Sequence, residues 1–213
     1  MTERRSLPLR RGIAAGIAAG LCLVAAARAR TGEAADERPP AVRFVNVAKE
    51  AGLTLLNHSG SPGKDTINET VGNGVCLADF DDDGFLDIFL PNGQPATGAA
   101  ARSALYRARG DGTYEDRTDG SGAALAGFWA QGCVAADYDA DGRIDLFVTG
   151  FGRYWLLKQT APLRFADVTA AAGLSGGRGW STGAAFADYD GDGWIDLWVS
   201  HYVDYDQDSP PLP

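Results

Sequence analysis

One nine-residue pattern, D-x-D-x-D-G-x-x-D, occurs three times and constrains the fold of this chain more than any other feature. The copies span Asp79–Asp87, Asp137–Asp145 and Asp188–Asp196. Carboxylates on alternate residues followed by a Gly predict a tight loop, because Gly alone adopts a positive φ without a Cβ penalty. Four carboxylates this close repel one another strongly unless a cation lies among them. The repeated pattern therefore favours three cation-binding loops over three solvated turns.

Oxygen ligands in a flexible loop suit Ca²⁺ best among the hard cations, so one Ca²⁺ is predicted in each loop. The first, third, fifth and ninth residues are predicted to bind through carboxylates, and the seventh through its backbone carbonyl. The predicted ligands are Asp79, Asp81, Asp83, Phe85 and Asp87, then Asp137, Asp139, Asp141, Arg143 and Asp145, and finally Asp188, Asp190, Asp192, Trp194 and Asp196. An EF-hand is excluded, because it needs a Glu at loop position twelve, where this chain has Leu90, Val148 and Val199.

Each loop has the same sequence context, which predicts a strand on either side of it. A Gly lies five residues before the first Asp, and an apolar run follows the last Asp. Short β-branched and aromatic runs beside Gly turns are typical of strands. The glycines are Gly74, Gly132 and Gly183, and the apolar runs are Ile88–Leu90, Leu146–Val148 and Leu197–Val199.

Two more strands are predicted in each of the first two units, which makes four strands in a repeat. The first two loops begin 58 residues apart and the last two begin 51 apart. Four strands in ~50 residues match one blade of a β-propeller. The predicted third and fourth strands are Leu105–Arg107 and Thr113–Arg117 in the first unit, and Leu156–Lys158 and Arg164–Val168 in the second.

Residues 42–213 are therefore predicted to be all-β, forming a partial β-propeller of four-stranded antiparallel blades. Arg43–Val47 is predicted to be a lone fourth strand, and the last unit stops after its second strand. About two and three-quarter blades of an incomplete ring would be present. On this interpretation the 213 residues are a piece of a longer protein, truncated at Pro213. Its missing blades would leave open strand edges that favour association.

The N-terminal residues 1–29 have the layout of a secretory signal peptide. Four arginines precede an apolar run over residues 12–27, and Ala27-Arg28-Ala29 resembles a cleavage site. The run is short for a membrane span, which leaves an uncleaved membrane anchor as the alternative. Residues 30–41 are predicted to be a linker. The predicted location is extracytoplasmic, either periplasmic or secreted.

The charge of the chain argues against a nucleic-acid partner. Cleavage after Ala29 would remove five Arg and one Glu, lowering the formal net charge from −9 to −13. A strongly acidic surface repels the phosphate backbone. Much of this acidity lies in the three loops, where bound Ca²⁺ would offset it.

The cysteines and histidines are predicted to have structural roles. Cys76 and Cys133 lie three and four residues before their loops. A one-residue offset on a strand points side chains to opposite faces, which argues against a bridge between equivalent positions of neighbouring units. Buried free thiols are therefore predicted. His58 is predicted to be a hydrogen-bonded loop residue and His201 a surface residue.

The chain resembles the FG-GAP/VCBS calcium-binding repeats of integrin-type propellers. Within those it most resembles bacterial secreted proteins related to cartilage acidic protein, which often carry an ASPIC/UnbV domain. The resemblance covers Ala41 to about Asp208 and implies a Ca²⁺-stabilised, extracytoplasmic propeller. The sequence departs from the family pattern in two ways: no G-A-P triplet follows an F-G, and no ASPIC/UnbV region is present. It rests on the Asp loops together with Glu69–Gly74, Gly110–Tyr114, Trp180–Gly183 and Val199–Asp206.

The leading functional hypothesis is a secreted, non-enzymatic, Ca²⁺-binding propeller that acts in adhesion or protein interaction. Its partner would be a protein or a carbohydrate, with no nucleic acid and no membrane contact after signal cleavage. One alternative is a lectin-like propeller, and another is the propeller part of a secreted polysaccharide-active hydrolase or lyase. The sequence contains no nucleophile elbow, phosphate loop or Cys/His zinc cluster. Fold alone does not decide among these functions.

Overall fold

The computed structural model describes residues 43–64, 66–98, 100–176 and 179–203. The predicted signal peptide at 1–29 and the linker at 30–41 lie outside the described residues. Within the described part of the chain, no helix is long and apolar enough to cross a membrane.

The regular secondary structure of the described chain is almost entirely short strands, joined by turns and loops. A single 3₁₀ turn, η1, covers Ile67–Thr70. The strands are β1 (Cys76–Ala78), β2 (Asp87–Leu90), β3 (Ala104–Ala108), β4 (Tyr114–Asp116), β5 (Ala130–Ala136), β6 (Asp145–Gly150), β7 (Trp155–Ala161), β8 (Arg164–Asp167), β9 (Ser181–Ala187) and β10 (Asp196–His201).

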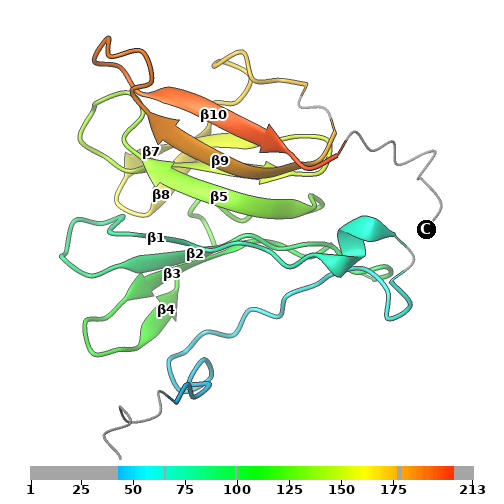
Figure 1. Cartoon of the computed structure of the whole chain (residues 1–213). Helices are drawn as coiled ribbons and strands as arrows, with labels where there is room; N and C mark the ends of the chain where they lie inside the picture. The colour runs from blue at the N-terminus through cyan, green and yellow to red at the C-terminus, as the bar shows by residue number, and fades with distance from the viewer. Residues whose placement is uncertain (1–42, 65, 99, 177–178, 204–213) are drawn as a thin grey trace, which may run out of the picture. The chain divides into compact units, whose positions relative to one another are not determined.

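These strands form two complete blades and the first half of a third. Antiparallel sheets run in the order β1-β2-β3-β4 and β5-β6-β7-β8, while β9 pairs only with β10 (Figure 1). The register of the first two blades is equivalent, with Ile88 opposite Tyr106 and Leu146 opposite Leu157. The all-β, partial-propeller prediction is confirmed, as are the predicted four strands of each complete blade.

The strand predicted at Arg43–Val47 is absent, and that prediction is wrong. These residues are assigned to no strand, and the chain turns directly after them, with the Ala51 amide donating to the Val47 carbonyl at 2.8 Å. A strand forms only where a neighbour supplies a hydrogen-bonding ladder, and the described residues pair no strand with this segment. The Ala51 carbonyl instead accepts one bond from the Tyr114 amide at 2.8 Å.

The main core lies between the blades. Phe80, Phe89 and Leu105 from the first blade cluster with Leu146 and Phe165 from the second. Phe80 and Phe165 meet edge to face, with ring centroids 5.6 Å apart. Residues of the apolar runs that follow the first two loops, such as Phe89 and Leu146, are therefore buried between the blades, as expected for a propeller.

A smaller cluster covers the other face of the first blade. Ile88 and Tyr106 are buried there, and Leu53 and Leu55 pack against them. The Tyr106 hydroxyl accepts a bond from the Leu55 amide at 2.8 Å. The segment before η1 thus covers the face of the first blade that lies away from the main core.

The repeated glycines before the first two loops, Gly74 and Gly132, allow the backbones of neighbouring units to approach closely. A Cβ on Gly132 would lie only 2.6 Å from the Thr182 carbonyl oxygen, and one on Gly74 would lie 3.3 Å from the Gly132 Cα. The Gly74 amide donates to the Gln131 carbonyl at 2.6 Å. These glycines are therefore required by packing between units.

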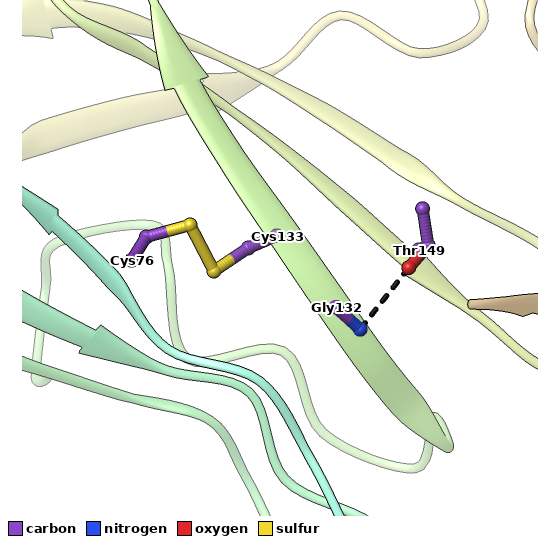
Figure 2. The surroundings of a disulfide bond; sticks show 4 residues. All are labelled: Cys76, Gly132, Cys133 and Thr149. Carbon is purple, nitrogen blue, oxygen red and sulfur yellow. Dashed lines mark hydrogen bonds between the residues drawn. A yellow bond between two sulfur atoms is a disulfide. The ribbon is translucent and has the colours of Figure 1, made fainter. Parts of the chain in front are cut away.

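Cys76 and Cys133 form a disulfide, so the prediction of free thiols is wrong. Their Cα atoms are 5.9 Å apart, and the bond joins β1 of the first blade to β5 of the second (Figure 2). Free thiols would follow only if equivalent positions faced each other across the blades. Instead the contacting residues are 57 apart, as are Gly74 and Gln131. A residue of the first blade thus contacts the residue 57 positions later, although the repeat is 58 residues long. This one-residue stagger compensates for the one-residue difference in position between the two cysteines.

Candidate metal centre

Each Asp pattern forms the loop between the first two strands of a unit. In each loop the first, third and ninth carboxylates converge, and one oxygen from each lies within 4.8 Å of the others. The converging groups are Asp79, Asp81 and Asp87; Asp137, Asp139 and Asp145; and Asp188, Asp190 and Asp196. The structure therefore brings together three of the four predicted carboxylate ligands in every loop.

The first Asp of each loop organises the turn through backbone amides. In the first loop, Asp79 accepts bonds from the Asp83 amide at 3.1 Å and the Gly84 amide at 2.7 Å. Asp137 and Asp188 accept the equivalent pairs of bonds. Gly84 has φ 88°, so the predicted role of the Gly in the turn is confirmed. The fourth loop position is also left-handed, which the sequence analysis missed.

The ninth Asp connects the loop to the third strand of its blade. Asp87 accepts the Phe80 amide at 2.9 Å on one oxygen and the Ala108 amide at 2.8 Å on the other. Asp145 accepts the Tyr138 and Gln159 amides in the same way, at 3.2 and 2.7 Å. Burial raises the pKa of both carboxyls, while these amide bonds act in the opposite direction.

The third Asp carries the clearest sign of a missing partner. The Oδ1 atoms of Asp81 and Asp139 are buried and accept no hydrogen bond from the described residues. The Asp81 side chain is only 10% exposed. A buried carboxylate oxygen without a partner costs free energy, and each of these atoms belongs to a group of three converging carboxylates.

The other oxygen of the third Asp is paired with a basic side chain from the third strand. Arg107 on β3 bonds Asp81 and also contacts Asp83 at 2.6 Å. Lys158 on β7 bonds Asp139 and lies 3.0 Å from Asp141. The bond from Lys158 lowers the pKa of Asp141, and the bonds to Asp139 and Asp141 raise the pKa of Lys158.

The fifth Asp lies outside the converging groups. Asp83, Asp141 and Asp192 each accept the amide of the seventh residue, at 3.0, 3.1 and 2.8 Å. The Arg143 guanidinium also contacts Asp141 at 2.6 Å. Their role as metal ligands stays a prediction, as does that of the carbonyls of Phe85, Arg143 and Trp194.

The basic residues Arg107 and Lys158 were missed by the sequence analysis. The available signal was their position, since each is the third residue of a Leu-led run in an equivalent strand. Their distances from the preceding loops differ because the first unit has a longer connection, which hid the equivalence.

The donor set fits a hard cation. Three carboxylates converge, all donors are oxygen atoms, and a buried Asp oxygen in each complete blade lacks a hydrogen-bond partner. Ca²⁺ takes six to eight oxygen ligands with flexible geometry. The first, third and ninth Asp of each loop would hold such an ion, and the ion would neutralise their mutual repulsion.

The sheets and loops together define the class as a β-propeller built from Asp-loop repeats. Comparison with protein-family models finds the FG-GAP-like repeat at residues 79–148 and 137–199. These matches cover more than half of the chain, which belongs to the FG-GAP-like repeat family. A search of curated proteins finds no match. The family and fold support a β-propeller interaction module.

Proposed function

We propose that this protein is an extracytoplasmic, Ca²⁺-binding propeller module that binds a partner protein and acts in adhesion or recognition rather than in catalysis. The observation that carries the proposal is the set of three equivalent carboxylate groups, together with the unpartnered buried oxygens of Asp81 and Asp139. Membership of the FG-GAP-like repeat family supports it. Within that family, we also propose a narrower relationship to secreted proteins that carry ASPIC/UnbV domains.

The disulfide supports the proposed location. Disulfides form and persist in oxidising compartments such as the periplasm and the extracellular space. The bond between Cys76 and Cys133 joins neighbouring blades, and export through the predicted signal peptide would deliver the chain to such a compartment. The two lines of support are independent, because the cysteines lie outside residues 1–29.

In the proposed role, calcium stabilises the fold, and the surfaces of the blades bind the partner. Each ion would connect the two strands that flank its loop, and in the two complete blades it would also be linked to the third strand through the ninth Asp. A ligand that binds only the folded state stabilises it by about 2.7 kcal/mol per site at a hundredfold excess over Kd. The interaction surface would therefore be present in calcium-rich surroundings and weakened in their absence.

The experiment that tests calcium binding is a comparison of thermal melting in Ca²⁺, Mg²⁺ and chelator. Millimolar Ca²⁺ should raise the melting temperature well above the value in equal Mg²⁺. Asp81→Asn should reduce the calcium-dependent rise, because it removes a converging carboxylate. The matched control is Asp82→Asn in the same loop, whose exposed side chain lies outside the group. Identical melting in calcium and in chelator would contradict the proposal.

Carbohydrate binding is a second candidate, favoured by one observation. The Trp194 side chain in the third loop is 66% exposed and Tyr189 is 87% exposed, and exposed aromatic rings stack on sugars. Polysaccharide-dependent quenching of Trp fluorescence, lost in Trp194→Ala, would support it.

A further inference from the structure

Gln159 on β7 contacts the Asp loops of both complete blades, and it is only 3% exposed. Within its own blade, its backbone amide donates to Asp145 at 2.7 Å, and its carbonyl accepts a bond from the Arg143 Nε at 3.0 Å. Its side-chain amide reaches the first blade and donates to the Phe80 carbonyl at 2.7 Å. One residue is thus bonded to the seventh and ninth positions of the second loop and to the second position of the first loop.

The Phe80 carbonyl belongs to the peptide bond that precedes Asp81. Asp81 is the third Asp of the first loop, and its buried Oδ1 accepts no hydrogen bond from the described residues. The amide of Phe80 donates to Asp87 at 2.9 Å. Gln159 therefore fixes the backbone between Asp79 and Asp81, two of the three carboxylates that converge in this loop.

Further contacts hold the first loop against the second blade. Phe165 on β8 lies opposite Gln159 in the register of the sheet. Its ring meets that of Phe80 edge to face, with centroids 5.6 Å apart. The disulfide between Cys76 and Cys133 joins β1 and β5, the strands that lead into the two loops. A change in the second loop can therefore be transmitted to Phe80 through packed and bonded groups.

The cross-blade bond from Gln159 is not part of the repeat. Ala108 is the equivalent residue of the first blade, because its amide donates to Asp87 as that of Gln159 donates to Asp145. An alanine side chain has no donor that could reach a neighbouring loop. The contact is therefore specific to one position of this sequence, and it can be removed without changing the backbone bonds of the blade.

We propose that Gln159 is a positioning residue that couples the first two loops, so that Ca²⁺ bound in one loop raises the affinity of the other. This inference rests on the proposed calcium binding. Carboxylates in an empty loop repel one another, and an ion that orders Asp145 also orders Gln159 and, through it, the Phe80 peptide. Binding of the second ion then costs less conformational entropy, which gives positive cooperativity. The effect is reciprocal, because coupling between two binding sites is the same in both directions.

The test measures the Ca²⁺ affinity of each loop separately, by NMR titration of the full chain. The amides of Gly84 and Gly142 report the first and second loops, because each donates to the first Asp of its loop. In the original chain both signals should shift together, with a Hill slope above one. Asp139→Asn removes a converging carboxylate from the second loop. It should weaken binding in the first loop by about fivefold, the lower end of typical coupling between sites.

The control for the loss of charge is Glu50→Gln, which removes one carboxylate from an exposed position outside the loops. It should leave the Ca²⁺ affinity of the first loop unchanged. If Glu50→Gln weakens the first loop as much as Asp139→Asn does, the effect comes from net charge and the coupling is overturned.

The role of Gln159 is tested by a double-mutant cycle with Gln159→Met. Methionine has a similar length and volume but no side-chain donor, and the backbone bonds to Asp145 and Arg143 remain. In this variant Asp139→Asn should no longer change the affinity of the first loop. A merely structural role for Gln159 would leave the fivefold effect of Asp139→Asn intact, and that result would overturn the proposal. Gln159→Ala is the second variant, because Ala108 shows that an equivalent position accepts alanine.

The outcomes distinguish this inference from the calcium proposal on which it rests. If neither loop glycine shifts in millimolar Ca²⁺, calcium binding itself fails and the coupling fails with it. If both signals shift but Asp139→Asn leaves the affinity of the first loop unchanged or raises it, calcium binding stands and only the coupling is overturned. That comparison uses the original Gln159 and decides the question even if both substitutions of this residue unfold the chain.

Discussion

The second blade and the third unit contain nearly the same loop in different surroundings. Asp145 in the second blade is 0% exposed, whereas Asp196 in the third unit is exposed. Phe147 is 0% exposed and the equivalent Trp198 is 72% exposed. The loop backbones are nevertheless organised by the same Asp-to-amide bonds. The loop sequence thus determines the turn, whereas burial also depends on the neighbouring unit and charge neutralisation depends on the third strand.

The largest difference between these regions should appear on truncating one equivalent aromatic residue in each. Phe147→Ala removes a ring that packs against Tyr154 and Phe186, and it should lower the free energy of unfolding by about 3–5 kcal/mol. Trp198→Ala should change it by less than about 0.5 kcal/mol, because that side chain is mainly exposed. Urea denaturation of both variants measures the two values, and equal losses would break the comparison.

The disulfide should contribute the next largest effect. Cys76→Ser/Cys133→Ser removes a link between residues 57 apart and should lower the free energy of unfolding by about 2–4 kcal/mol. Reducing agent should destabilise the original chain by a similar amount and leave the double variant unchanged. A reductant effect on the double variant would mean that the stabilisation comes from elsewhere.

The smallest effect should come from making the second loop resemble the third. Lys158→Met removes the cation that pairs with Asp139 and Asp141. In chelator this variant should melt a few degrees lower, roughly the range for a partly exposed ion pair, because the carboxylates then repel one another. Added Ca²⁺ should raise its melting temperature more than that of the original chain.

The control for that variant is Lys49→Met, an exposed lysine that lies outside the Asp loops. It should leave both the melting temperature and the calcium response unchanged. If Lys158→Met behaves in the same way, then Lys158 has no part in balancing the charge of the loop.

Most of the fold could be predicted from local sequence. The Asp loops, the apolar runs and the repeat spacing predicted the strands of both complete blades, because each of these strands also has its pairing partners within the same repeat. The predicted strand at Arg43–Val47 failed because a strand depends on a partner, which local sequence does not specify. The disulfide was missed because the stagger between blades is a tertiary property.

The candidate site was predictable only in part. The Asp pattern indicated the three carboxylates that converge in each loop, but it also included the fifth Asp, which lies outside them. The distinct role of the ninth Asp depends on amides of the third strand, and the pairing of Arg107 and Lys158 depends on sheet register. Both arise from residues distant along the chain, so the loop sequence alone could not reveal them.

The most direct test of the calcium assignment is an anomalous difference map from crystals grown in millimolar Ca²⁺. We predict one peak in each loop, at about 2.3–2.6 Å from a carboxylate oxygen of the first, third and ninth Asp. In the first two loops, Asp81 Oδ1 and Asp139 Oδ1 should be among the ligands. A map with no peak in any of the three loops, in which Asp81 Oδ1 and Asp139 Oδ1 contact no ion, would contradict the account.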